Sequence, residues 1–145
     1  MIDKQDFYWG AALIRLLDNP GCLALTKNQF GYLVNSSQLV LLKYSTKSRS
    51  PWQFTFGIDE IANLKKTSDR YSLVVIGLIC GGDGVCAITW TQANFLLMGK
   101  SGAISVRRKF HEHYGVSGSA GELDHKISIR NWPAILFWND INRHP

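Results

Sequence analysis

The sequence predicts an α/β or α+β fold in which helices flank a single mixed β-sheet. Three observations indicate this class: amphipathic segments with helical spacing, short apolar or alternating runs typical of strands, and turn residues between them. Their order is helix, three strands, helix, strand, followed by additional strands and a short helix. Because no repeat or linker divides the sequence, residues 1–145 are expected to form a single domain.

The first helix is expected to begin after Asp3, which can cap it, and to end at the turn sequence DNPG, residues 18–21. The second is predicted for residues 58–69, where acids in the first turn and lysines near the end suit the helix dipole. A short third helix is expected at residues 91–100. Apolar residues recur at helical spacing in the first helix, namely Phe7, Leu13, Ile14, Leu16 and Leu17.

Strands are predicted where short apolar runs are bounded by turn residues. The sequence NSS at residues 35–37 indicates a tight hairpin, and the continuously apolar run 71–79 is typical of a central strand covered on both faces. The glycine-rich segment 115–121 is expected to be a flexible loop, and the apolar stretch 132–138 to lie mostly in the core. The predicted strands are residues 23–34, 38–45, 52–56, 71–79, 85–90 and 103–114.

Composition narrows the class of protein. A hydrophobic content of 46% with 19% charged residues is typical of a soluble globular protein, and no apolar run is long enough to span a bilayer. The acidic N-terminus differs from a secretory signal, so a cytoplasmic protein without membrane contact is expected. The odd number of cysteines and their spacing predict free thiols, with neither a disulfide framework nor a zinc site, and no cofactor is indicated.

The formal net charge of +5 favours polyanionic partners, and two segments of the sequence carry basic patterns that suit such a partner. The first segment follows the strand at 38–45 and is rich in Ser, Thr, Lys and Arg, which suit hydrogen bonding to phosphate oxygens. Lys47 and Arg49 supply its charge, and Trp52 is a candidate platform on which a base can stack. The alternative is a solvated connection in which Pro51 stiffens the turn and Trp52 faces the core.

The second basic segment is the strand predicted for residues 103–114. Alternation places Arg107, Lys109, His111 and His113 on one face, where they can follow a phosphate backbone. The same pattern is also typical of the polar outer face of a half-buried strand. The choice between these interpretations depends on whether this stripe lies beside the first basic segment.

His111 and His113 carry two further hypotheses. They can ligate a metal, together with Asp124 or His125, or act as a general acid and base because histidine titrates near neutral pH. The spacing fixes no third ligand and no nucleophile is identified. No metal site is therefore predicted.

Lys43 lies near the end of the apolar strand at residues 38–45, on the same face as Leu39 and Leu41. Its stem can pack on these leucines while the ammonium reaches water. Alternatively, the ammonium is aimed at a phosphate, where it supplies a point charge.

The helix, three strands, helix, strand order, with Lys43 on the second strand of the hairpin, resembles the core of the PD-(D/E)XK nuclease-like superfamily over residues 3–79. In active members an acid two residues before the lysine and another near the start of that strand together hold a divalent metal. Here Leu41 occupies the first place, and Asn35 or Gln38 lies near the second. Because Mg²⁺ needs anionic oxygen ligands, the resemblance implies a catalytically silent nuclease-like core.

The block KYSTKSRSPWQFTF, residues 43–56, is also similar to a segment of uncharacterised bacterial proteins, to which no activity is attached. We therefore predict a non-enzymatic domain that binds nucleic acid through its phosphate backbone, in a largely sequence-independent and salt-sensitive manner. The residues expected to bind are Lys43, Lys47, Arg49, Trp52, Arg107 and Lys109.

Two alternatives come from other classes. One is a metal-dependent nuclease whose acidic site is displaced to Asp59, Glu60 or Asp124. The other is a protein-interaction module, an adaptor or inhibitor, in which the charge only provides solubility and the aromatic residues make the contact. Independently of these classes, the tryptophan-rich stretch 132–138 also suits a contact in a homo-oligomer.

Overall fold

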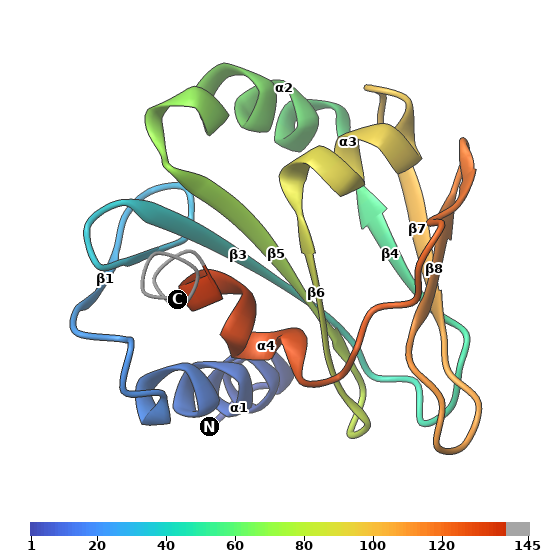
Figure 1. The fold of residues 1–145 in the computed structure, drawn as a ribbon, viewed down its shortest axis with the longest axis horizontal. Helices are drawn as coiled ribbons and strands as arrows, with labels where there is room; N and C mark the ends of the chain where they lie inside the picture. The colour runs from blue at the N-terminus through green and yellow to red at the C-terminus, as the bar shows by residue number, and fades with distance from the viewer. Residues whose placement is uncertain (139–145) are drawn as a thin grey trace.

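The computed structural model describes residues 1–138 and confirms the predicted class, with a mixed sheet flanked by helices (Figure 1). The larger sheet has the strand order β1-β2-β3-β5-β6, in which β3 and β5 are parallel and the other neighbours antiparallel. Its strands are β1 (Leu25–Lys27), β2 (Tyr32–Val34), β3 (Gln38–Ser45), β5 (Leu73–Cys80) and β6 (Gly84–Thr89).

Helices cover both faces of this sheet, as Figure 1 shows. One buried cluster lies between the sheet and the side that carries α2, α3 and β4, and a second lies on the side of α1 and α4. β5 contributes to both clusters, which agrees with the prediction of a central strand. The helices are α1 (Lys4–Asp18), α2 (Ile58–Thr67), α3 (Trp90–Leu97) and α4 (Asn131–Ala134), with 3₁₀ turns η1 (Ser68–Arg70) and η2 (Ile135–Phe137).

The strands predicted for residues 52–56 and 103–114 both lie outside the single sheet that was expected. Residues Trp52–Phe56 form β4, which pairs with β7 (Gly102–Arg107) in a second, four-stranded antiparallel sheet with the order β4-β7-β8-β9. The physical reason is that both edges of β3 are already occupied, by β2 and β5, so the next strand has no place beside it. β4 instead buries alternate side chains between the two sheets, namely Trp52, Phe54 and Phe56.

The segment after residue 102 also differs from the prediction. β7 ends at Arg107 rather than continuing to residue 114, because residues 108–113 leave the strand and turn, with a backbone hydrogen bond from Glu112 to Lys109. The glycine-rich segment is a hairpin rather than a flexible loop: β8 (Gly115–Gly118) pairs with β9 (Gly121–Glu122). The alternating basic stripe expected through His113 therefore does not form.

The hairpin predicted around residues 35–37 is confirmed. Asn35 and Ser36 both have positive φ angles, 50° and 63°, which match the right-handed twist of the flanking strands, and Val34 pairs with Gln38. The stretch 132–138 packs as expected, since Trp132 and Phe137 are buried and the indole nitrogen of Trp132 donates to the carbonyl of Ala12 at 3.1 Å. None of the helices within residues 1–138 combines the length and apolar character needed to cross a bilayer.

Candidate nucleic-acid interface

The two basic segments meet at one cleft, which we call the loop cleft. It has a volume of about 520 Å³, within the range of ligand pockets, and lies where the β3–β4 loop, the β5–β6 turn and the loop after β7 approach one another. All three connections lie at the same end of the molecule (Figure 1). The lining residues are Ser48, Arg49, Ser50, Trp52, Asp83, Arg108, Lys109 and Phe110.

Strand pairing brings these segments together. β4 and β7 are antiparallel with Trp52 opposite Val106, so the residues before β4 must lie beside the residues after β7. A hydrogen bond of 3.3 Å from the Ser50 hydroxyl to the Arg108 carbonyl extends the contact beyond the strands. Positions that are 58 residues apart in sequence thereby form two walls of one cleft.

The turn after β5 forms the third wall, and Gly81 is required there. Gly81 has a φ of +55°, and a Cβ at this position would lie 2.3 Å from the carbonyl oxygen of Lys47. The same carbonyl accepts a hydrogen bond of 2.9 Å from the indole nitrogen of Trp52. Glycine thus allows the turn to pack directly on the basic loop, whereas the sequence GGDG, residues 81–84, by itself indicates only a turn.

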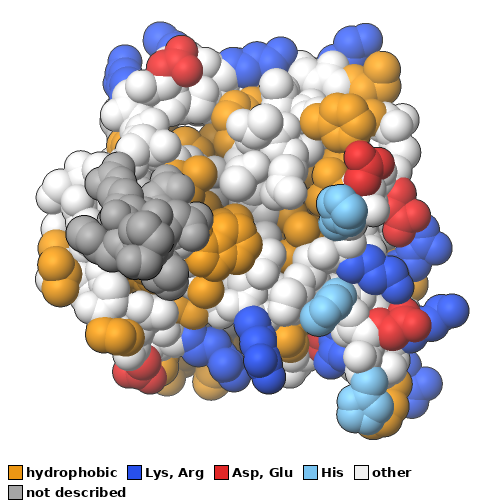
Figure 2. All heavy atoms as spheres, viewed as in Figure 1, with side chains coloured by type: hydrophobic (Ala, Val, Ile, Leu, Met, Phe, Trp, Pro, Cys, Tyr) orange, Lys and Arg blue, Asp and Glu red, His pale blue; other side chains and the backbone are white. Residues whose placement is uncertain are grey.

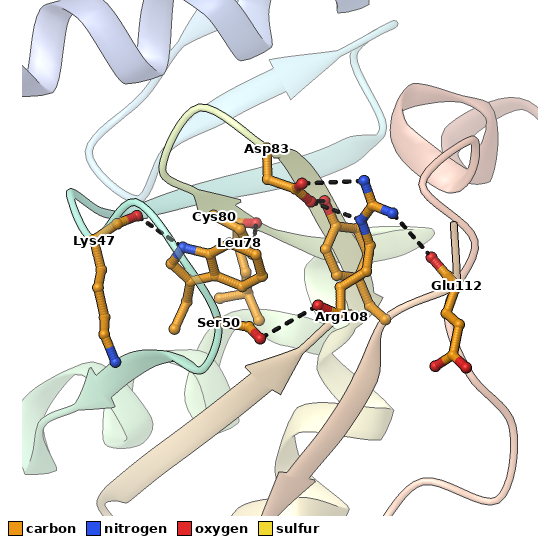
Figure 3. Close-up of polar contacts among 9 residues, drawn as sticks. Lys47, Ser50, Leu78, Cys80, Asp83, Arg108 and Glu112 are labelled. Carbon is orange, nitrogen blue, oxygen red and sulfur yellow. Dashed lines mark hydrogen bonds and ion pairs between the residues drawn. The ribbon is translucent and has the colours of Figure 1, made fainter. Parts of the chain in front are cut away.

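Asp83 joins the turn to the loop after β7 (Figure 3). Its carboxylate accepts hydrogen bonds from Arg108 at 2.8 and 3.0 Å and from the hydroxyl of buried Tyr114 at 2.8 Å. Burial opposes ionisation of Asp83, but the hydrogen bonds from Arg108 and Tyr114 and the charge of Arg108 outweigh it and hold the pKa below its ordinary value. Asp83 is therefore charged at neutral pH and neutralises Arg108.

Of the predicted binding residues, Arg49 and Lys109 line the loop cleft and carry charges that no acidic side chain pairs with in the described part of the chain. Both are exposed, and neither has a carboxylate within 4.0 Å among residues 1–138. Arg107 is exposed at the end of β7, beside the cleft but not in its lining. The ammonium of Lys47 donates to the carbonyl of Pro51 at 3.1 Å, and its side chain extends away from the Asp83–Arg108 pair (Figure 3).

Two of the predicted binding residues, Trp52 and Lys43, lie in positions that do not agree with the binding hypothesis. Trp52 is only 2% exposed and belongs to the core, so it cannot act as a stacking platform for a base. Lys43 forms an ion pair with Glu60 of α2, with distances of 2.9 and 3.0 Å, and its ammonium lies 4.5 Å from the centroid of the Phe56 ring. Lys43 thus contacts a helix and an aromatic ring and lines no part of the loop cleft.

Phe110 is a candidate contact residue that the sequence prediction missed. Its side chain is 85% exposed at the rim of the loop cleft, beside Lys109, and its ring lies 3.8 Å from that of His111. Alternation along a continuous strand places Phe110 on the face opposite the basic stripe. The available signal was its position in a run of charged residues and histidines, RRKFHEH, which is unusual for a buried strand.

The side chains proposed for metal binding or acid–base catalysis do not form a common site in the described residues. His111 lies in the turn with a φ of 66°, and His111, His113, Asp124 and His125 are all exposed. Within the part of the chain that the structure describes, no group of three or more His, Cys, Asp or Glu side chains could hold a metal ion. Figure 2 shows histidines and charges of both signs gathered over the β7 and β8 side, where Glu112 pairs with Lys126 at 3.0 Å.

The three cysteines are free thiols, as predicted, and none of them lines the loop cleft. Burial raises the pKa of the Cys80 and Cys86 thiols, which keeps them protonated at neutral pH. They act as small apolar side chains in the core.

Comparisons of the chain with protein-family models, curated proteins and solved structures gave no match. The resemblance to the PD-(D/E)XK nuclease-like superfamily accordingly stays a prediction.

Proposed function

We propose that this protein is a nucleic-acid-binding domain that holds a single-stranded segment at the loop cleft. The observation that carries the proposal is the meeting of two basic segments, residues 47–50 and 107–110, at one cleft with an exposed aromatic ring at its rim. Neither feature alone is specific, but together they provide the two interactions by which single strands are held: charge against the backbone and stacking against the bases.

The charge balance of the cleft supports this function. The lining contains three cations, Arg49, Arg108 and Lys109, and one carboxylate, Asp83, which is used by Arg108. Arg49 and Lys109 are left to neutralise phosphates. Ser48 lies in the same lining, and its hydroxyl is a typical hydrogen-bond donor to phosphate oxygens, whereas the Ser50 hydroxyl already donates to the Arg108 carbonyl.

Phe110 favours a single strand over a duplex. A base can stack on an exposed ring only when it is free of its own neighbours, and such stacking contributes about 1–3 kcal/mol per base. In our proposal Phe110 takes the role that the sequence suggested for Trp52. Phosphates lie against Arg49 and Lys109 while one base lies against the Phe110 ring.

The direct test compares charge removal at the cleft with equal charge removal elsewhere. We expect the Arg49→Ala, Lys109→Ala double variant to bind a fluorescent single-stranded oligonucleotide at least about tenfold more weakly at low salt than the unmodified protein. We also expect the slope of log affinity against log salt to fall by about 1.4, which corresponds to two phosphate contacts on a single strand. Fluorescence anisotropy at several salt concentrations measures both quantities.

Lys66→Ala, Arg70→Ala is the matched control. Both residues are exposed. Arg70 comes just before β5, and the turn that lines the loop cleft comes just after it. The length of β5, eight residues or about 23 Å, therefore separates Arg70 from the cleft. The control removes the same amount of charge. It should leave the slope of log affinity against log salt unchanged and keep the affinity within about twofold of the unmodified protein. Equal losses in both double variants would show non-specific attraction and contradict the proposed site.

The same samples test the nuclease alternative. One observation favours keeping it: Glu60, one of the acids proposed for a displaced site, lies beside the ammonium of Lys43. Incubation of supercoiled plasmid with the protein and Mg²⁺ or Mn²⁺ measures nicking. Metal-dependent nicking that is lost in Glu60→Gln would assign the function to that acid rather than to the loop cleft.

A further inference from the structure

The helix α1 presents an unpartnered apolar stripe on the face directed away from the sheet. Ala12 and Leu16 face the core and are fully buried, whereas Phe7, Ile14 and Leu17 are 63, 60 and 56% exposed. The apolar residues that recur at helical spacing are therefore divided between a buried and an exposed face. Three large exposed apolar side chains along one helix are typical of a contact surface.

The exposed face follows the spacing of a helix-pairing seam. Its members are separated by three and four residues in alternation, the repeat at which side chains interlock between two helices. The centre is small: Ala11 is exposed, and a Cβ added to the neighbouring Gly10 would meet nothing within 4 Å. A second helix can approach closely at this point. The seam consists of Lys4, Phe7, Ala11, Ile14 and Asp18.

This seam is complementary to itself when one copy is reversed. A two-fold axis through Ala11 places Lys4 of one copy opposite Asp18 of the other, and Phe7 next to Ile14. Residues Lys4 and Asp18 have no ion-pair partner within 4.0 Å in the described part of the chain. Both charges are therefore available to a partner.

The helix dipole supports the same arrangement. Lys4 lies at the positive N-terminal end of α1 and Asp18 at the negative C-terminal end, so each charge is unfavourably placed in an isolated copy. An antiparallel partner reverses both relations, because it brings the Lys4 ammonium to the partner's negative end and the Asp18 carboxylate to its positive end. We propose that α1 pairs antiparallel with α1 of a second copy of this chain, around a two-fold axis at Ala11.

The expected dimer is weak and depends on concentration. α1 has 15 residues and is therefore about 22 Å long. One helix pair of this length buries less surface than the roughly 1,600 Å² of a standard stable interface. Sedimentation equilibrium should show reversible monomer–dimer exchange within the range up to about 1 mM. A protein that remains monomeric over this range would overturn the proposal.

A cysteine crosslink tests the position of the axis. In a Cys22→Ser background, Ala11→Cys places two thiols across the two-fold axis, where the short Cα separation that a disulfide needs is available. We expect this variant to form a disulfide-linked dimer at least ten times faster under mild oxidation than the matched variant Ala62→Cys, whose exposed alanine lies on α2. Similar rates for the two variants would show that α1 does not pair at Ala11.

Charge reversal tests the orientation. Lys4→Asp and Asp18→Lys should each weaken dimerisation several-fold, and the double exchange should restore it, because only antiparallel pairing places these residues opposite each other. Phe7→Glu should abolish the dimer while the far-ultraviolet circular dichroism and melting temperature stay unchanged, since Phe7 is exposed. Failure of the double exchange to restore the dimer would contradict the antiparallel arrangement.

Discussion

Lys43 and Arg49 are only six positions apart in the sequence, yet their surroundings are opposite. Lys43 is on a sheet face covered by α2, where Glu60 neutralises it at 2.9 Å and the Phe56 ring lies beneath it. Arg49 is on the connection after that strand, exposed at the loop cleft. Phe56 and Trp52 occupy the two ends of β4, about 13 Å apart, so the paired lysine and the cleft belong to different places.

This difference shows how position along a strand decides the role of a cation. On a covered face the cost of removing an ammonium from water must be offset, and a neighbouring helix provides the carboxylate. On a connection between strands the charge stays hydrated and open to a ligand. Substitutions at the covered residues should therefore change stability, and substitutions at the open ones should change binding.

The largest expected effect separates the two aromatic residues of the cleft. Trp52→Ala should reduce the free energy of unfolding by about 3–5 kcal/mol, because it removes a buried side chain between the sheets. Phe110→Ala should leave stability within about 0.5 kcal/mol, since the ring is exposed, but should weaken single-strand binding by about 1–3 kcal/mol. Urea unfolding and anisotropy titration measure these quantities. A stable Trp52→Ala variant with reduced binding would reverse the assignment.

The next effect concerns Asp83 and depends on pH. Asp83→Asn should lower the free energy of unfolding by about 2 kcal/mol at pH 7, because it removes charge-assisted hydrogen bonds to Arg108. Since the pKa of Asp83 is lowered in the folded state, its contribution is complete above the unfolded pKa and is lost as the pH falls through the folded pKa. Urea unfolding from pH 7 to below about 4 should therefore show the two proteins converging in stability.

Tyr114→Phe is the control for that prediction. It removes a single hydrogen bond to the same carboxylate and keeps the ion pair, so its cost should be nearer about 1 kcal/mol. Asp83→Asn should also free the charge of Arg108 and increase affinity for a single strand at low salt, whereas Tyr114→Phe should not. A stability difference between Asp83→Asn and the unmodified protein that stays constant with pH would contradict the assigned role of the carboxylate.

Local sequence patterns predicted where helices and strands lie along the chain better than which elements they pack or pair with. The helix at residues 58–69, the hairpin at 35–37 and the buried strand at 71–79 depend on spacing and turn residues, and the structure confirms all three. The place of β4 depends on which sheet edges are already occupied, which is a property of the whole chain. Similarly, helical spacing in α1 showed a helix but not which of its two apolar faces is buried.

The candidate site was predicted in part for the same reason. Basic residues in two segments indicated a shared anionic partner, and Arg49 and Lys109 do line one cleft. Alternation could not reveal that the strand ends at Arg107, and it therefore placed Phe110 on the face opposite Lys109. Asp83 was seen only as a turn residue, because its role arises from hydrogen bonds to residues 25 and 31 positions away.

The smallest expected effect is at Lys43. A double-mutant cycle with Lys43→Met and Glu60→Gln should give a coupling energy of about 0.5–1 kcal/mol, because the two side chains are partly exposed, at 21 and 31%, and solvent screens the pair. Neither variant should change single-strand affinity more than about twofold, since the pair lies outside the cleft lining. A gain in affinity for Glu60→Gln would show that the freed ammonium reaches the ligand, and the division between covered and open cations would then fail.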